Sequence, residues 1–159
     1  MRRVIAAVIA AAALAVGCSA AAAAGPAGAV ARGTVQQLVD AVIAEHGGTQ
    51  TAWNEVSWDG GATVLTLAPD AVGGITPFAA VGSCASGKYC AYSGSNLTGS
   101  KLTFSTCGSH SVTALPSVGS IANARSSGVV VALNGVIFVA AQDPGGWKNV
   151  SGTVKQIGC

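Results

Sequence analysis

The cysteines carry the clearest chemistry in this sequence, and their spacing favours disulfides over metal binding. Cys18 lies in an apolar N-terminal stretch, apart from the others. The remaining four are Cys84, Cys90, Cys107 and Cys159. An even number of cysteines in an exported chain favours two disulfides, and four cysteines allow three pairings. Zinc sites usually pair closely spaced cysteines with further Cys or His ligands, whereas here only His110 follows Cys107.

The N-terminus has the layout of a secretory signal peptide. A basic start at residues 1–3 precedes an apolar run at residues 4–16, and small residues at 22–24 form a cleavage site. These features predict secretion to the extracellular space. Ala15-Val16-Gly17-Cys18 is also a partial lipoprotein signal. If that site is used, Cys18 carries lipid and the protein stays on the membrane; otherwise we expect no membrane attachment.

The charge balance argues against a nucleic-acid partner. The whole chain has a formal net charge of +2, and cleavage of the signal removes Arg2 and Arg3. Six basic and six acidic residues then remain, so the mature chain is neutral. A neutral chain without a basic patch fits neither nucleic-acid binding nor electrostatic steering of a ligand. We expect a monomer that binds no nucleic acid.

The segment before the cysteines predicts a helix followed by a β-hairpin. Apolar residues recur at helical spacing from Val35 to Ile43, with Thr34 placed as N-cap and Gly47-Gly48 as the stop. Residues 51–58 and 62–68 then read as two strands joined by a turn at Asp59-Gly60-Gly61. A Gly-rich linker over residues 73–82 follows.

From Cys84 onward the chain alternates short strands with Gly, Ser and Asn turns. Asn134-Gly135 is typical of a type I′ hairpin turn. The expected strands are Tyr89–Tyr92, Lys101–Phe104, Gly128–Leu133 and Val136–Ala141. Two halves, 84–120 and 121–159, each hold several strands, as in a pair of Greek keys that close a sandwich. The predicted fold class is therefore an all-β core preceded by one α-helix and a β-hairpin.

The stretch from Cys84 to Gly99 resembles the streptomycete metalloproteinase inhibitors, a family of small secreted proteins with one βγ-crystallin-like domain. The shared pattern is Cys-x5-Cys-x-Tyr-Ser-Gly-x-x-Leu-x-Gly. With a signal peptide expected at 1–24 and the helix, hairpin and linker at 25–82, the resemblance implies a crystallin-like domain at 83–159. It also implies a Cys84–Cys90 disulfide, which leaves Cys107 to pair with Cys159.

The resemblance further implies a non-enzymatic inhibitor that inserts a rigid loop into the cleft of a secreted peptidase. In the family, the reactive bond lies in a second short disulfide loop. This chain has no such loop, because the only cysteine after Cys107 is Cys159. Two other loops are therefore candidates for this role, Cys84–Cys90 and Ala141–Trp147.

A binding module for calcium or an envelope glycan is the alternative function. Asn123, Ser126 and Ser127 resemble a crystallin calcium loop, although Ala122 and the lack of a nearby carboxylate leave few ligands. The aromatic residues that could stack on a sugar are Trp53, Trp58 and Trp147. Packing of Trp53 and Trp58 against the predicted hairpin and helix is the competing interpretation, because large aromatic side chains bury well.

Nothing in the sequence predicts an enzyme. The histidines are His46 and His110, and no nucleophile elbow, metal motif or phosphate loop accompanies them. Ser109 and Ser111 flank His110, but neighbours on a strand point to opposite faces. We therefore expect no catalytic residues, and no cofactor apart from the candidate calcium ion.

Overall fold

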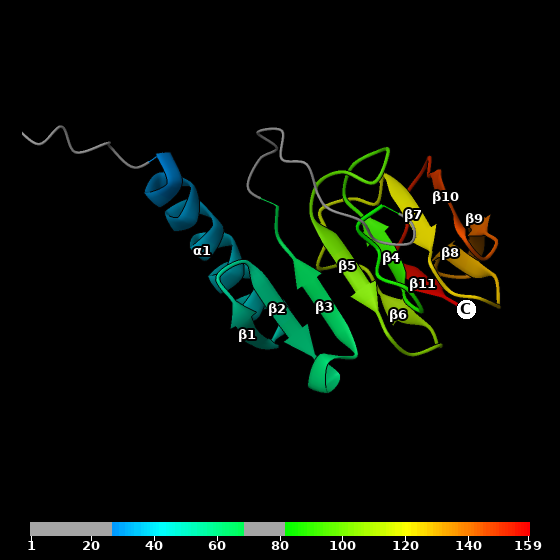
Figure 1. Cartoon of the computed structure of the whole chain (residues 1–159), viewed down its shortest axis with the longest axis horizontal. Coiled ribbons are helices and arrows are strands. Elements are labelled where there is room, and N and C mark those ends of the chain that lie inside the picture. Colours follow the sequence, from blue (N-terminus) through cyan, green and yellow to red (C-terminus); the bar gives the residue numbers. More distant parts are fainter. Residues whose placement is uncertain (1–26, 69–81) are drawn as a thin grey trace, which may run out of the picture.

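The computed structural model describes residues 27–68 and 82–159. The expected signal peptide with Cys18 and nearly all of the expected linker lie outside these residues. The described chain consists of one helix followed by eleven strands in two sheets, and every strand pairing is antiparallel (Figure 1). The predicted all-β fold with a single N-terminal helix is confirmed.

The helix, α1 (Ala27–His46), is longer than the sequence pattern predicted. The prediction that Thr34 begins it was wrong, because the Ala-rich residues before Thr34 continue the helix rather than preceding it. The end was predicted well: Gly47 has a φ of 68°, and its N–H donates to the Ile43 carbonyl at 2.9 Å. Val35 and Val39 are buried on the side of the helix that faces the sheet.

Three short strands follow the helix: β1 (Thr49–Ala52), β2 (Glu55–Trp58) and β3 (Thr63–Thr66). The single strand predicted over residues 51–58 is wrong, because the chain turns at Trp53-Asn54 and β1 pairs back on β2. The predicted β2–β3 hairpin is present, with its turn at residues 59–61.

The larger sheet joins this N-terminal segment to the cysteine-rich region. Its order is β1-β2-β3-β5-β4-β7-β10. The new strands are β4 (Tyr89–Tyr92), β5 (Lys101–Phe104), β7 (Ser120–Asn123) and β10 (Gly146–Asn149). Strands β4 and β5 have the predicted bounds, and β3 pairs directly with β5, placing Leu65 opposite Leu102. The N-terminal segment therefore extends the sheet of the region that follows it.

The smaller sheet has the order β6-β11-β8-β9. Its strands are β6 (His110–Ser111), β11 (Gln156–Gly158), β8 (Val130–Asn134) and β9 (Ile137–Gln142). Strands β8 and β9 lie within two residues of the predicted bounds, whereas β6 was not among the predicted strands. The crystallin-like pairing of two Greek keys stays a prediction.

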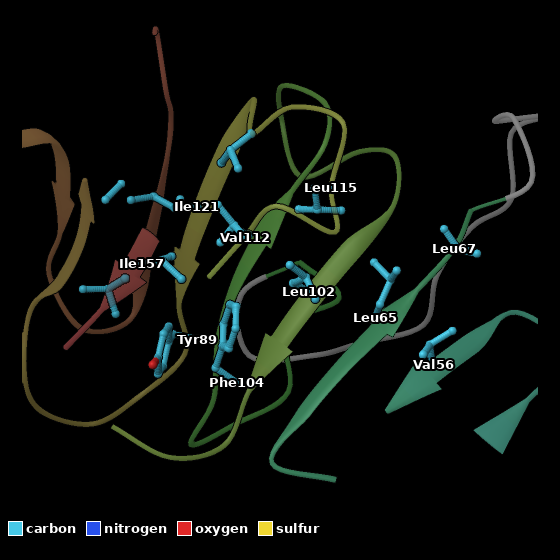
Figure 2. Close-up of a cluster of buried hydrophobic side chains, with 14 of the residues drawn as sticks. Val56, Leu65, Leu67, Tyr89, Leu102, Phe104, Val112, Leu115, Ile121 and Ile157 are labelled. Carbon is cyan, nitrogen blue, oxygen red and sulfur yellow. The ribbon is translucent and has the colours of Figure 1, made fainter. Parts of the chain in front are cut away.

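One hydrophobic core connects the helix, the hairpin and both sheets. Tyr89 and Phe104 stack with ring centroids 5.1 Å apart, and both side chains are fully buried. Figure 2 shows how side chains from β2, β3, β4, β5, β7 and β11 meet in this core. Its most deeply buried large aliphatic members are Val35, Val39, Val56, Leu65, Leu102, Val112, Ile121, Val130 and Ile157. Because these residues belong to one cluster, burial of the helix and of the sheet is coupled.

Both tyrosines of the chain are buried, and this predicts a delayed alkaline titration. Burial raises the pKa of Tyr89 to about 12, opposed in part by the positive charge of Arg125. Burial also raises the pKa of Tyr92, opposed by hydrogen bonding to Ser83. A folded-state pKa above the unfolded value of about 10 means that stability is fully present below pH ~10 and falls as the pH rises through ~12.

The measurement is a pH titration that follows phenolate absorbance and circular dichroism together. We expect phenolate to form only above the usual range, and to form as the fold is lost. Ionisation of either tyrosine near its ordinary pKa, in a protein that stays folded, would contradict the burial of its hydroxyl.

Candidate functional site

The first disulfide closes a short loop against β7. Cys84 and Cys90 are bonded at 2.05 Å, and both are fully buried. The loop between them turns at Gly87, which has a φ of 77°. The N–H of Gly87 donates to the carbonyl of Ala124 at 2.8 Å, so the loop is held at its middle as well as at its ends.

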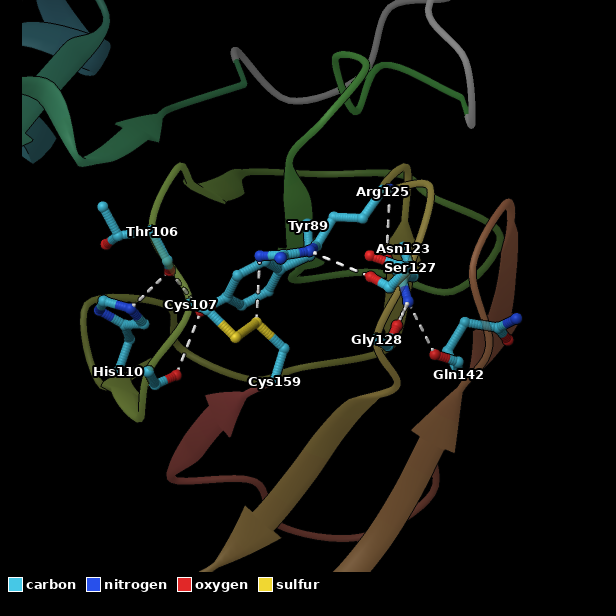
Figure 3. The surroundings of a disulfide bond; sticks show 11 residues. Tyr89, Thr106, Cys107, His110, Asn123, Arg125, Ser127, Gly128, Gln142 and Cys159 are labelled. Atoms are coloured by element: carbon cyan, nitrogen blue, oxygen red, sulfur yellow. Dashed lines mark hydrogen bonds between the residues drawn. A yellow bond between two sulfur atoms is a disulfide. The ribbon is translucent and has the colours of Figure 1, made fainter.

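The second disulfide joins Cys107 to Cys159 and connects the loop before β6 to the residue after β11. These two disulfides are the pairs expected from the sequence. Figure 3 shows that Arg125 reaches this bridge, and its Nη1 donates to the sulfur of Cys159 at 3.2 Å. Next to it, the Tyr89 hydroxyl lies 3.1 Å from the carbonyl oxygen of Thr106. The Cys107–Cys159 disulfide therefore links the end of β11 to residues that lie beside Tyr89 on β4.

A buried amide, Asn123, fixes the two loops that flank the β8–β9 hairpin. Its side-chain nitrogen donates to the carbonyl oxygens of Gly128, at 2.8 Å, and Gln142, at 3.0 Å (Figure 3). Its side-chain oxygen accepts the N–H of Arg125 at 3.2 Å. Its backbone carbonyl accepts the N–H of Gly145 at 2.8 Å. The hydrogen bonds of Asn123 therefore fix the position of the start of β8 relative to the end of β9.

The same contacts show how the candidate calcium residues are placed. The amide oxygen of Asn123 already accepts a backbone N–H, and the Arg125 guanidinium donates to the Ser127 carbonyl at 3.4 Å. Asn123 is fully buried, whereas Ser126 and Ser127 are exposed. Within residues 27–68 and 82–159, no three His, Cys, Asp or Glu side chains form a group that could hold a metal ion. Asn123 is therefore engaged in hydrogen bonds within the protein, and calcium binding at Asn123, Ser126 and Ser127 stays a prediction.

The β8–β9 hairpin ends in an apolar tip that sequence reasoning did not mark as a site. Its turn residues are Gly135 and Val136, between Asn134 and Ile137. The predicted type I′ turn at Asn134-Gly135 is wrong. Only the first turn residue, Gly135, has a positive φ, of 64°, as in a type II′ turn. This register places Val136 at the apex, where it is fully exposed.

The two residues after the apex are exposed as well. Val136 is 100% exposed, Ile137 64% and Phe138 63%. We call these three residues the apolar tip. The signal for it was present in the sequence as three consecutive large apolar residues after a glycine turn. That run was interpreted only as the start of a strand.

The three tryptophans do not form one platform. Trp147, expected in a turn, lies on β10 and is 44% exposed, and Trp53 lies in the β1–β2 turn and is 46% exposed. Trp58 is partly buried against the core, and its indole N–H donates to the carbonyl of His46 at 3.1 Å. Strands β2 and β10 are five strand spacings apart, or about 24 Å at about 4.8 Å per spacing. A sugar-binding surface shared by all three residues is therefore not formed.

Both histidines line a cavity of about 270 Å³ between the helix end and β6. The other lining residues include Trp58, Asp59, Thr63 and Thr113. The Nε2 of His110 lies 3.0 Å from the carbonyl oxygen of Thr106, and its ring stacks on Phe104 at 5.1 Å. His46 lies 3.8 Å from the carboxylate of Glu45. In the described residues, neither imidazole is hydrogen-bonded to a hydroxyl or thiol that it could activate as a nucleophile.

The comparison with known protein families identifies the central part of the chain. Residues 78–131 match peptidase inhibitor family I36. The resemblance seen in the sequence is thereby confirmed. No curated protein and no solved structure shows significant similarity to the chain. Among the residues that the structure describes, no helix is long and apolar enough to cross a membrane.

The I36 region, residues 78–131, contains the structural frame of the molecule. It includes the Cys84–Cys90 loop, the strands β4, β5 and β7, and the buried amide of Asn123. It ends inside β8, just before the apolar tip. The I36 match supports a peptidase-inhibitor-like function, and hence a peptidase as the partner. The two disulfides fit an oxidising compartment such as the extracellular space.

Proposed function

We propose that this protein is a secreted, non-enzymatic inhibitor of metallopeptidases that acts by placing a rigid loop in the substrate cleft. The match of residues 78–131 to peptidase inhibitor family I36 is the observation that carries the proposal. The proposed domain is a crystallin-like unit over residues 83–159. The N-terminal helix and hairpin support it by extending its larger sheet.

A loop inhibits well when its bound conformation exists before binding, because little conformational entropy is then lost. Three features of this chain favour such a loop. One disulfide closes the Cys84–Cys90 loop and the other joins Cys107 to Cys159, and the hydrogen bonds of Asn123 fix the loops beside the β8–β9 hairpin. The β8–β9 hairpin consists of short antiparallel strands, and their pairing restricts the motion of the loop between them.

Inhibition in this proposal is binding alone, so it needs no catalytic group in the inhibitor. The two histidines contact backbone, aromatic and carboxylate groups instead of a nucleophile. The proposed partner is a secreted metallopeptidase, and the proposed inhibitor acts as a monomer at a ratio of one to one. Export through the predicted signal peptide would place both proteins in the same compartment.

The test is a titration of active peptidase with the full chain, expressed with its own leader in a secreting host and purified in its oxidised form. We expect stoichiometric inhibition of a thermolysin-like metallopeptidase. Reduced and alkylated protein is the matched control and should lose this inhibition, because the loops lose their cross-links. Undiminished activity of metallopeptidases and serine peptidases alike, at micromolar excess of folded inhibitor, would overturn the proposed function.

A further inference from the structure

We propose that the apolar tip, Val136–Phe138, is the segment that enters the peptidase cleft. The inference rests on the proposed function and assigns it to particular residues. The resemblance noted in the sequence implied a second short disulfide loop as the inhibitory segment, whereas Cys107 is bonded to Cys159, 52 positions away. The structure offers the β8–β9 hairpin instead.

Exposure of the apolar tip is the first argument. Val136, Ile137 and Phe138 are 100%, 64% and 63% exposed and are consecutive in the chain. Single exposed apolar residues are common on protein surfaces, but a contiguous apolar group usually marks a binding site. A two-residue turn is also narrow, so this group forms a projecting end rather than a flat face. Such a shape suits insertion into a cleft.

The rigidity of the hairpin is the second argument. Strand β8 is paired on both sides, with β9 and with β11, and β11 leads into Cys159 of the second disulfide. The turn contains only two residues, so the strands pair directly on both sides of it. A bulge at Val139, the residue after the tip, sets the register of this pairing. The tip is therefore held in one conformation by contacts that do not involve the proposed partner.

The chemistry of the tip indicates the kind of cleft that it fits. Residues 126–142 contain no charged side chain. Strand β9 lies at the edge of its sheet, so its outer N–H and C=O groups are available to pair with an extended strand. We therefore assign a metallopeptidase cleft that binds extended chains and has an apolar specificity pocket. The pocket would take an aliphatic or aromatic side chain from the tip.

The two loops expected from the sequence offer less to such a pocket. Between the bonded cysteines, the exposed residues are Ala85, Ser86 and Gly87, which are too small to fill a large apolar pocket. In the Ala141–Trp147 loop, the exposed residues are Asp143, Pro144, Gly145 and Trp147, and Trp147 lies on β10 with 44% exposure, less than any residue of the apolar tip. A carboxylate in an apolar pocket would be desolvated without a partner, which is unfavourable. Neither loop has a counterpart to the fully exposed Val136.

The experiment compares substitutions at three loop ends for their effect on inhibition of a thermolysin-like metallopeptidase. Val136→Asp and Ile137→Asp place a charge in the tip. Ser86→Asp and Pro144→Asp place the same charge on the two other loops. All four sites are exposed, so we expect unchanged circular dichroism and thermal midpoints. We expect the tip variants to raise the inhibition constant about 100-fold, as loss of a central contact does.

A conservative variant and the control loops complete the test. Val136→Leu should keep inhibition close to wild type, because the pocket still receives an aliphatic side chain. Ser86→Asp and Pro144→Asp should also stay close to wild type. Unchanged inhibition by the folded tip variants would overturn the assignment and leave the proposed function standing. So would a loss of inhibition in Ser86→Asp or Pro144→Asp alone.

Two further outcomes separate this inference from its rivals. If the wild-type protein inhibits no peptidase, both the proposed function and the role of the tip are overturned. Sedimentation of wild type and Ile137→Asp tests whether the tip instead binds a second copy of the chain. A dimer that dissociates in the variant while inhibition is unaffected would overturn the inference in favour of self-association.

Discussion

We expect removal of the Cys107–Cys159 disulfide to lower the free energy of unfolding by about 4 kcal/mol. The bonded residues are 52 positions apart, so the bond removes a large loop-closure entropy from the unfolded chain. The double variant Cys107→Ala, Cys159→Ala tests this in urea unfolding. The variant also loses the hydrogen bond from Arg125 to the Cys159 sulfur. This hydrogen bond holds the end of β11, the strand that pairs with β8.

The first disulfide provides the matched comparison. Cys84 and Cys90 are only six positions apart, and chain entropy alone then gives about 2 kcal/mol. The double variant Cys84→Ala, Cys90→Ala should therefore lose less from this source, although both side chains are buried. If the variant of the longer loop is as stable as wild type, its disulfide does not constrain the unfolded chain as proposed.

Local patterns in the sequence predicted the parts of the fold that depend on near neighbours. The Gly, Ser and Asn turns that separate short strands predicted Tyr89–Tyr92 and Lys101–Phe104 at their observed bounds. The Gly47-Gly48 pair gave the end of α1. In each case the deciding interaction is a turn, a cap or a side-chain alternation within a few residues, and such interactions are visible in a sequence.

The features that were missed depend on partners that are distant in the chain. Pairing of β3 with β5 brings residues 63–66 against residues 101–104, and nothing local indicates this contact. The turn of the β8–β9 hairpin was displaced by one residue from its expected position. The type I′ preference of Asn-Gly was overridden by the register that pairs Asn134 with Ile137. That one-residue change is what places Val136 at the apex.

Asn123 shows the same limit for the candidate site. The sequence marked it as an oxygen donor for calcium, because Asn123 with Ser126 and Ser127 resembles a crystallin calcium loop. The structure uses it as a buried connector whose acceptor on β9, the Gln142 carbonyl, is 19 positions away. An amide can serve either purpose, and only its surroundings decide which. This yields a second prediction with a large effect.

We expect Asn123→Ala to lower the free energy of unfolding by about 3 kcal/mol. The substitution removes three hydrogen bonds of a fully buried side chain, which join it to the carbonyls of Gly128 and Gln142 and to the N–H of Arg125. A hydrogen bond within a protein contributes about 0.5–1.5 kcal/mol, and this substitution removes three of them together. Urea unfolding measures the loss, and amide exchange at Arg125 should accelerate because its acceptor is gone.

Asn149→Ala is the matched control, because Asn149 also joins separate segments through its amide. Its oxygen accepts the N–H of Asn96 at 2.7 Å, and its nitrogen donates to the Asn96 side chain at 3.0 Å. Both residues are exposed, so water can replace these hydrogen bonds, and we expect a loss below about 1 kcal/mol. Equal losses in the two variants would mean that burial does not set the cost. Asn123 would then be no more than one of several surface connectors, and the apolar tip would have to derive its rigidity from strand pairing alone.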